Sequence, residues 1–356
     1  PDEIERLRRD PRVRAISEDR GGEGALLESV PLVGADMLHA YGYDGKGVTV
    51  AVFDTGIDVT NPDFAGRIVA QQCFCDNLDG TGCCPNGSTV QSGPGSAVDD
   101  NGHGTHVSGI LGSSGASAPR GVAPAVQIVA VKVMDADNSF RSFTQIYRAL
   151  EWIIAKRRDV RVINMSFGSY ELFSPYGCSS AAAAIGMQDI VHALRRRGVL
   201  ITASSGNQGS IDATTMPSCM DEVIAVAATY DIEGAPTGIC SPREAHTDQV
   251  ACFANSSDAI DLVAPGAAIT ASRRGGGSIT HAGTSMAAPH VAGAIALMLQ
   301  VSGGTVTARQ TEDILKATGH VVFDGRNGLL FPRLDVLSAV ASTPRPSLPK
   351  RRGVRK

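Results

Sequence analysis

Three short glycine-containing segments each carry one side chain of a type that could take part in catalysis. They are residues 54–58 (DTGID) with Asp54, residues 101–106 (NGHGTH) with His103, and residues 283–289 (GTSMAAP) with Ser285. A serine hydroxyl is a weak nucleophile unless a neighbouring base accepts its proton, and an imidazole can act as that base. A carboxylate on the other ring nitrogen holds the imidazole in the required tautomer and stabilises its charged form. The three segments therefore predict a nucleophilic serine, provided that the fold brings them together.

The histidine and serine segments both lead into sequences that favour helices. Apolar residues at 106–111 follow His103, and a longer apolar stretch at 287–299 follows Ser285. Pro289 fits the first turn of the second helix, where the missing N–H of a proline costs no hydrogen bond. Ser285 would then lie at the positive end of a helix dipole, which stabilises the negative charge that forms during acyl transfer.

The main part of the chain alternates between apolar runs and amphipathic segments. The runs at 48–53, 126–133, 162–165, 199–203 and 223–228 predict strands, and the segments at 142–156 and 181–197 have helical periodicity. Strands that are apolar on both faces, joined by helical crossovers, predict an α/β fold: a mostly parallel central sheet with helices on both faces. Asp54 ends the first strand, at the edge of such a sheet where active sites gather.

These segments are similar, in type and in order, to the Asp, His and Ser motifs of the subtilisin-like serine proteases, the subtilase family. The resemblance covers about residues 30–341. It implies a subtilisin-like fold and a secreted serine endopeptidase that hydrolyses peptide bonds through an acyl-enzyme. It also implies that Asp54 orients the imidazole, that His103 is the general base and acid, and that Ser285 is the nucleophile.

The resemblance also suggests how a substrate binds. Residues 203–207 (ASSGN) resemble the segment that supplies the oxyanion-hole amide, here Asn207, and residues 164–168 (NMSFG) resemble the segment whose backbone pairs with an extended substrate. A pocket would lie between them, with residues 135–142 along its opposite edge. Its substrate-binding residues would be Ser166, Phe167, Gly168, Ser204, Ser205 and Gly206. Because these walls carry no assignable acid, we expect broad specificity with a preference for apolar or aromatic residues.

Two other polar residues fall within the same motifs. Asp58 lies four residues beyond the expected strand end, and His106 lies three residues along the expected helix. At these positions packing or a local hydrogen bond is a better prediction than a direct part in catalysis. The remaining histidines have no matching motif.

Composition excludes several classes of protein. The chain has 356 residues, of which 43% are hydrophobic and 19% charged, which fits a globular protein and not a disordered or coiled-coil one. The formal charge of −4 gives no reason to expect a nucleic-acid partner, and the longest apolar run, at 291–299, is far shorter than the roughly 18 residues of a membrane span. The expected partners are polypeptide substrates and the protein's own propeptide, and we expect a monomer.

The eight cysteines favour disulfides over a zinc site. Four of them, Cys73, Cys75, Cys83 and Cys84, lie within twelve residues and lack the usual C-x₂₋₄-C pairs of zinc ligands. Disulfides imply an oxidising compartment and hence secretion. The resemblance implies the pairs Cys178–Cys219 and Cys240–Cys252, and the cluster would pair among itself in a connectivity that the sequence leaves open.

The chain divides into four parts of unequal size. Residues 1–20 resemble the C-terminal end of an inhibitory propeptide, so we expect a longer precursor, and residues 21–29 are a glycine-containing linker or processing region. Residues 30–341 form the expected peptidase domain, which includes a cysteine-rich insertion at 71–98. Residues 342–356 are a basic, proline-containing tail that we expect to be disordered. Maturation would remove about the first 20 to 30 residues.

The expected chemistry needs no organic cofactor, and a metal site is not assigned. Asp63 matches an acid that binds calcium in many relatives, but residues 112–119 offer no carboxylate or asparagine to complete an oxygen cage. Asp99, Asp100 and Asn101 could contribute to another ion site, but a solvated turn is the better prediction for them, and whether calcium binds is left open. Two alternative functions remain: a catalytically silent binding domain with the same fold, and a cytosolic zinc-bearing regulator.

Overall fold

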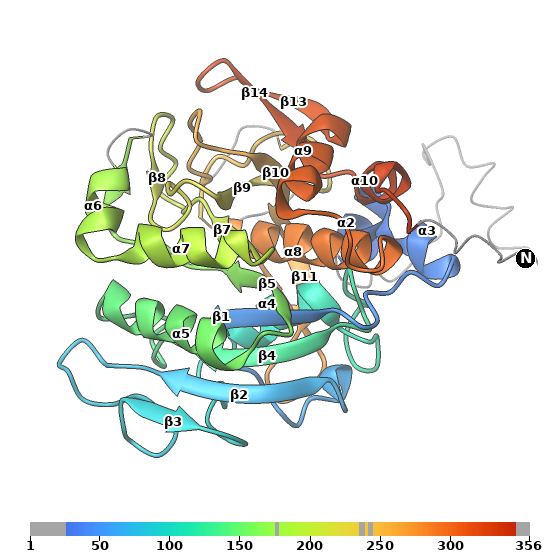
Figure 1. The fold of residues 1–356 in the computed structure, drawn as a ribbon. Coiled ribbons are helices and arrows are strands. Elements are labelled where there is room, and N and C mark those ends of the chain that lie inside the picture. The colour runs from blue at the N-terminus through green and yellow to red at the C-terminus, as the bar shows by residue number, and fades with distance from the viewer. Residues whose placement is uncertain (1–25, 175–177, 235–238, 241–244, 347–356) are drawn as a thin grey trace, which may run out of the picture.

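The computed structural model describes residues 26–174, 178–234, 239–240 and 245–346. The expectations for residues 1–25 and 347–356 lie outside the described residues. The described residues form a ten-stranded sheet in the order β13-β14-β10-β9-β7-β5-β1-β4-β2-β3, which is parallel from β14 to β2 and antiparallel at both edges (Figure 1). The strands are β1 (Thr49–Asp54), β2 (Ile68–Phe74), β3 (Val90–Ser92), β4 (Gln127–Lys132), β5 (Val160–Met165), β7 (Leu200–Ser204), β9 (Val223–Tyr230), β10 (Leu262–Ala267), β13 (His320–Asp324) and β14 (Leu329–Arg333).

Two small sheets and a set of helices surround this sheet. The small sheets pair β6 (Leu172–Phe173) with β8 (Thr214–Thr215) and β11 (Ile269–Ser272) with β12 (Ser278–His281). The helices are α2 (Leu26–Leu32), α3 (Ala35–Ala40), η1 (Pro62–Phe64), α4 (His103–Gly112), α5 (Phe143–Lys156), α6 (Cys178–Ala184), α7 (Met187–Arg196), α8 (Thr284–Val301), α9 (Ala308–Thr318) and α10 (Val336–Ser342).

The sheet has a hydrophobic core on each face. In β1, Val50 and Val52 pack into the core that contains α4 and α8, whereas Ala51 and Phe53 pack into the core that contains α5 and α7. Successive side chains of a strand point to opposite faces, so burial of all of them requires a layer of helices on each side. The α/β fold predicted from the apolar runs is confirmed.

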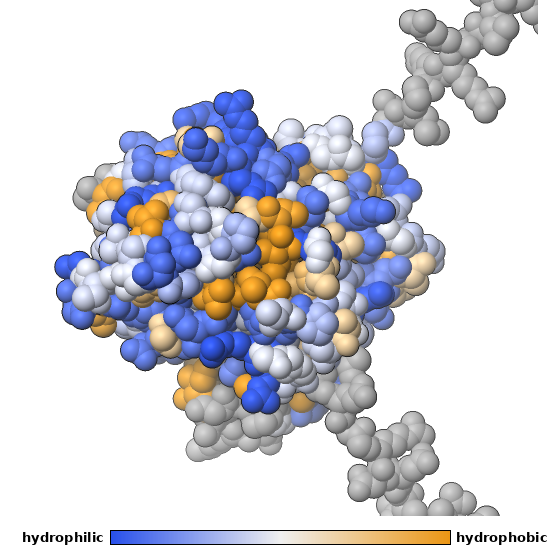
Figure 2. All heavy atoms as spheres, turned by 90° about the horizontal axis from the view of Figure 1, so that it is seen from below, coloured by the Kyte–Doolittle hydropathy of each residue, from blue (hydrophilic) through white to orange (hydrophobic). Residues whose placement is uncertain are grey.

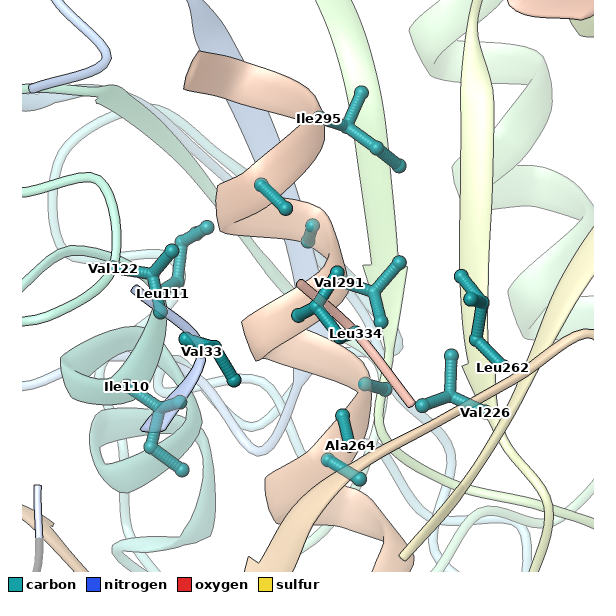
Figure 3. Packing of buried hydrophobic residues seen from close by; sticks show 14 of the residues in the cluster. Val33, Ile110, Leu111, Val122, Val226, Leu262, Ala264, Val291, Ile295 and Leu334 are labelled. Atoms are coloured by element: carbon teal, nitrogen blue, oxygen red, sulfur yellow. The ribbon is translucent and has the colours of Figure 1, made fainter. Parts of the chain in front are cut away.

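Helix α8 is the centre of the first core. Val291 and Ile295 on α8 lie between Ile110 and Leu111 of α4 on one side and the strands on the other (Figure 3). By length and composition α8 could cross a membrane, but 89% of it is buried inside the protein. Such burial is what a core helix of a globular domain shows. Its first turn is therefore held firmly at the edge of the sheet.

One predicted helix is two helices in the structure. The sequence suggests a single helix over residues 181–197, but α6 ends at Ala184 and α7 begins at Met187. Between them Gly186 adopts a φ of 72°, in the left-handed region that interrupts a helix. The regular periodicity on both sides of this glycine conceals the break.

All eight cysteines are paired, as Cys73–Cys84, Cys75–Cys83, Cys178–Cys219 and Cys240–Cys252. The last two are the pairs expected from the resemblance, and the clustered cysteines pair among themselves. The insertion at 71–98 contains the end of β2 and all of β3, so it extends the sheet at its edge. Because disulfides occupy every thiol, the zinc-bearing alternative is excluded.

The boundaries of the domain differ slightly from those expected. Helix α2 begins at Leu26, inside the segment interpreted as a linker, and the buried Ser29 hydroxyl lies 3.1 Å from Nε2 of His290. At the other end, α10 continues to Ser342, and Thr343 is buried. The domain therefore begins before Val30 and ends after residue 341, because the first and last helices of the domain pack on α8 or its neighbours.

The surface is much less apolar than the core. The face shown in Figure 2 is mostly hydrophilic, with a strip of hydrophobic residues near its middle. Isolated apolar residues on a surface are normal, and the strip alone does not indicate what covers it.

Candidate active site

Asp54 and His103 form a hydrogen-bonded pair. Asp54 is the last residue of β1 and fully buried, and His103 is the first residue of α4. The His103 Nδ1 atom lies 2.7 Å from Asp54 Oδ1. The close approach requires Gly104, because a Cβ there would lie 2.1 Å from the carbonyl oxygen of Gly56. Burial alone would lower the pKa of His103, but the charge and hydrogen bond of Asp54 outweigh it and raise the pKa above its usual value.

Asp99 fixes the loop that carries the histidine. Its carboxylate accepts five hydrogen bonds: from Thr55 Oγ1, from the N–H groups of Asn101, Gly102 and Thr105, and from Thr105 Oγ1. Burial by itself would raise the pKa of Asp99, but these donors hold it below its usual value. From the sequence Asp99 was expected in a solvated turn, with an ion site as the alternative, whereas the structure buries it. Its position just before a helix N-terminus was the signal for this role, because carboxylates commonly accept N–H groups there.

Lys132 stabilises the same loop through its buried side chain. This residue was not identified from the sequence. Its side chain is completely buried at the end of β4. The ammonium donates to the carbonyl oxygens of Thr55 and Met134, at 2.8 Å each, and to the Asp100 carboxylate at 2.7 Å. A buried lysine needs such partners for its charge. It therefore ties together the turn after Asp54 and the loop that precedes His103.

Ser285 lies at the beginning of α8 and in the same cavity as His103. The cavity has a volume of about 1000 Å³. The Ser285 hydroxyl donates to the carbonyl oxygen of Ser166 at 3.0 Å, and within the described residues it makes no hydrogen bond to His103. Proton transfer therefore requires the hydroxyl to leave Ser166 and turn towards the imidazole. Hydrogen bonds between catalytic groups often form only when the substrate is bound.

Asn207 and the start of α8 present two N–H donors to the cavity. The Asn207 Oδ1 atom accepts hydrogen bonds from the N–H of Thr284 at 2.9 Å and from its hydroxyl at 3.0 Å. Because a backbone N–H can only donate, this contact identifies Oδ1, and Asn207 itself lines the cavity. Ser285 is the second residue of α8, so its N–H has no partner within the helix. Thr284, which the sequence analysis did not assign, orients the amide.

Five of the six residues predicted to bind substrate line one cavity, and the sixth does not. A cavity of about 200 Å³ is lined by Ser166, Phe167, Gly168, Ser204 and Gly206, among other residues. Ser205 does not line it. Its side chain is fully buried, and the hydroxyl donates to the carbonyl oxygen of Asn255 at 2.9 Å. Adjacent residues of a strand end point in opposite directions, so Ser204 and Ser205 cannot both face the pocket.

Thr215 lies between the two walls of this pocket. A Cβ on Gly168 would lie 2.1 Å from Thr215 Oγ1, and one on Gly206 would lie 2.8 Å from Thr215 Cγ2. Thr215 therefore fills the space that both glycines leave free. No residue lining the pocket in the described part of the chain carries an ionised side chain. Thr215 lies 47 residues after Gly168 and nine residues after Gly206, outside both motifs, and no local signal pointed to it.

Asp58 and His106, the two other polar residues within the motifs, form local or packing hydrogen bonds, as expected from the sequence. The buried His106 ring places Nε2 within 3.1 Å of the carbonyl oxygens of Ile269 and Ile279, and burial lowers its pKa to about 3. It therefore stays neutral at ordinary pH and joins α4 to the β11–β12 hairpin. Asp58 accepts hydrogen bonds from Thr60 and Gly275.

The three acids considered for calcium have hydrogen-bond partners within the protein, and that of Asp100 is Lys132. The buried Asp63 carboxylate accepts hydrogen bonds from the N–H and hydroxyl of Ser117, from the N–H of Ala118 and from the hydroxyl of Ser272. Because both carboxylate oxygens of Asp63 already accept hydrogen bonds from protein groups, they are not open to coordinate a calcium ion. The same holds for Asp99. Within the described ranges, no group of three or more His, Cys, Asp or Glu side chains is placed to hold a metal ion.

Comparisons with known proteins identify the family of this chain. Residues 45–332 match the model of the subtilase family. Subtilisin E of Bacillus subtilis (strain 168) is 32% identical over 320 residues, which cover 88% of this chain and 72% of that protein. The subtilisin-like serine protease Pen ch 13 of Penicillium rubens is 34% identical over 273 residues, or 74% of this chain and 56% of that protein. The solved structure of a cold-adapted subtilisin-like serine proteinase has a TM-score of 0.61 and 28% identity, and the match covers 82% of this chain and 89% of that one.

Proposed function

The chain belongs to the subtilase family and is a serine endopeptidase, and we propose that it works through an acyl-enzyme formed on Ser285. The observation that carries the proposal is the hydrogen-bonded pair of Asp54 and His103, which faces the cavity at the start of α8 where Ser285 lies. A buried carboxylate on one ring nitrogen leaves the other ring nitrogen to take a proton.

In the first half of the reaction Ser285 Oγ forms a bond to the scissile carbonyl carbon and passes its proton to Nε2 of His103. The carbonyl oxygen becomes an oxyanion, which the Asn207 amide and the Ser285 N–H would stabilise. The C–N bond then breaks, and His103 returns the proton to the leaving amine. In the second half water adds to the acyl carbon, His103 takes the water proton and gives it back to Ser285, and the carboxylic acid is released.

For specificity we propose a broad preference for apolar or aromatic residues before the scissile bond. The support is the pocket of about 200 Å³, whose described lining includes Met134, Phe140 and Phe167 and no ionised side chain. The edge at residues 135–142 contains two acids, Asp135 and Asp137, and neither lines the pocket. Asp135 accepts hydrogen bonds from the N–H groups of Asp137 and Ser139. It is thus occupied within its own loop and does not select for a basic residue.

We also propose that the protein is secreted and matured by removal of an inhibitory N-terminal segment. Four disulfides support an oxidising compartment. Because α2 begins at Leu26 and Ser29 contacts the buried His290, cleavage would precede Leu26 and spare this helix. N-terminal sequencing of active protein tests this: a first residue before 21 or after 26 would contradict it.

Active-site labelling tests the proposed chemistry. A fluorophosphonate probe should label the wild-type protein stoichiometrically, and Ser285→Ala should abolish labelling. Ser180→Ala, which removes an exposed hydroxyl on α6, is the matched control and should label like the wild type. Labelling that survives Ser285→Ala would assign the nucleophile elsewhere. Failure of folded wild-type protein to label or to hydrolyse any peptide would favour the silent binding domain.

A further inference from the structure

The active site includes a second, larger cavity, and the proposed catalytic steps give no role to most of the residues that line it. It is the cavity of about 1000 Å³, and His103 and Ser285 form one end of it. Ser166 and Gly168 line the other pocket, so the residues before the scissile bond bind there. Because His103 delivers a proton to the departing amine, the chain that follows the scissile bond must leave past the imidazole. The larger cavity is therefore the leaving-group side of the cleft.

Two arginines line this leaving-group side. Arg273 and Arg274 begin the turn between β11 and β12, and both are exposed. The guanidinium of Arg273 makes no hydrogen bond or ion pair to any residue in the described ranges. That of Arg274 donates to the carbonyl oxygen of Asp100 at 3.2 Å. Neither side chain is held by a strong ion pair, so both remain able to meet a ligand.

The acids of the same cavity are already occupied. Burial alone would raise the pKa of Asp58, but hydrogen bonds from Gly275 and Thr60, together with Arg274, hold it below its usual value. The negative charge of Asp58 therefore interacts with groups of the hairpin turn. Asp99 is buried beneath its five donors. His281 also lines the cavity, and burial and the nearby His103 lower its pKa, so it is neutral near pH 7.

The turn itself has room to adjust. Gly275, Gly276 and Gly277 have φ values of 87°, 95° and 72°, and a side chain at any of them would meet nothing within 4 Å. Apart from the Gly275 N–H, which donates to Asp58 Oδ2 at 2.8 Å, the side-chain positions of these glycines face open space. The arginines before these glycines can therefore reach a substrate without disturbing packed residues.

From these observations we propose that the leaving-group side selects substrates with an acidic side chain among the first three residues after the scissile bond, through Arg273 and Arg274. The proposal rests on the proposed function, because it assumes that His103 and Ser285 cleave the chain. Exposed ion pairs each contribute a factor of roughly 1.4 to 5 in affinity. Two such pairs give an expected preference of about 2- to 25-fold for Glu over the uncharged Gln.

The test uses internally quenched peptides that are identical before the scissile bond and carry Glu, Gln or Lys at each of the three following positions. At low salt, kcat/KM should be about 2- to 25-fold higher for Glu than for Gln at one or more positions, and lowest for Lys. The preference should shrink at high salt, since salt screens exposed charges. The R273Q/R274Q double variant should bring the Glu-to-Gln ratio close to one.

The ratio is measured within each preparation, so it does not depend on the active fraction of a variant. Arg309→Gln removes an exposed arginine on α9 and should keep the wild-type ratio. Equal rates for Glu and Gln in wild type, or a preference that survives high salt and R273Q/R274Q, would overturn this inference. If wild type cleaves none of the peptides and no p-nitroanilide with the same acyl side, the proposed function itself fails.

Discussion

Removal of the Asn207 amide should lower turnover while leaving substrate binding unchanged. Thr284 holds Oδ1 of Asn207 through two hydrogen bonds, which fixes the amide, and in the proposed mechanism the Nδ2 group donates to the oxyanion. Asn207 is exposed in the open cleft and supports no buried contact except through Thr284. Asn207→Ala should therefore remove one donor to the transition state without unfolding the protein.

The size of the effect follows from the kind of hydrogen bond. A hydrogen bond to a charged group contributes about 1.5–3 kcal/mol, and about 1.4 kcal/mol corresponds to a factor of ten in rate. Asn207→Ala should therefore lower kcat by about 10- to 150-fold. Because the bond is strong only when the carbonyl oxygen carries charge, KM should change little.

The assay is steady-state hydrolysis of a peptide p-nitroanilide, with kcat and KM determined separately and thermal unfolding measured in parallel. Asn86→Ala, at an exposed position that lines neither cavity, is the matched control and should keep kcat at the wild-type value. An unchanged kcat for Asn207→Ala would refute the assignment. An increase in KM at constant kcat would mean that Asn207 binds substrate in the ground state instead.

Three further predictions concern specificity, pH and calcium. Thr215→Gly should deepen the pocket and raise kcat/KM for a phenylalanine substrate relative to an alanine one; an unchanged ratio would show that Thr215 is not its floor. Burial raises the pKa of Asp231 to about 7, above its ordinary 3.8, so its contribution to stability falls by up to about 4 kcal/mol as pH rises between these values. Asp231→Asn should therefore raise the Tm more at pH 8 than at pH 4, and an equal gain at both would contradict the cause. Asp63→Ala should lower stability by at least about 2 kcal/mol, because it leaves buried donors unpaired, and by the same amount with calcium or a chelator. A loss seen only with calcium would place the ion at Asp63.

Local patterns were sufficient for the framework of the molecule. The apolar runs identified β1, β4, β5, β7 and β9 to within a few residues, because strands buried on both faces must be apolar throughout. The glycine-containing segments located Asp54 and His103, which the structure joins by a hydrogen bond. They succeeded because sharp turns at strand ends and helix starts need glycine. The break at Gly186 was missed, since a glycine within periodic sequence does not reveal its φ.

Contacts between distant segments could not be read from the chain. The partner of the Ser285 hydroxyl is Ser166, 119 residues away, and Asn207 is oriented by Thr284, 77 residues away. The Thr215 floor of the pocket and the buried Lys132 beneath the histidine loop likewise depend on which strands become neighbours. Periodicity and turn chemistry act over a few residues and specify each element. Which side chains then meet depends on strand order and on the packing of helices over the sheet, and these arise only when the whole core is assembled.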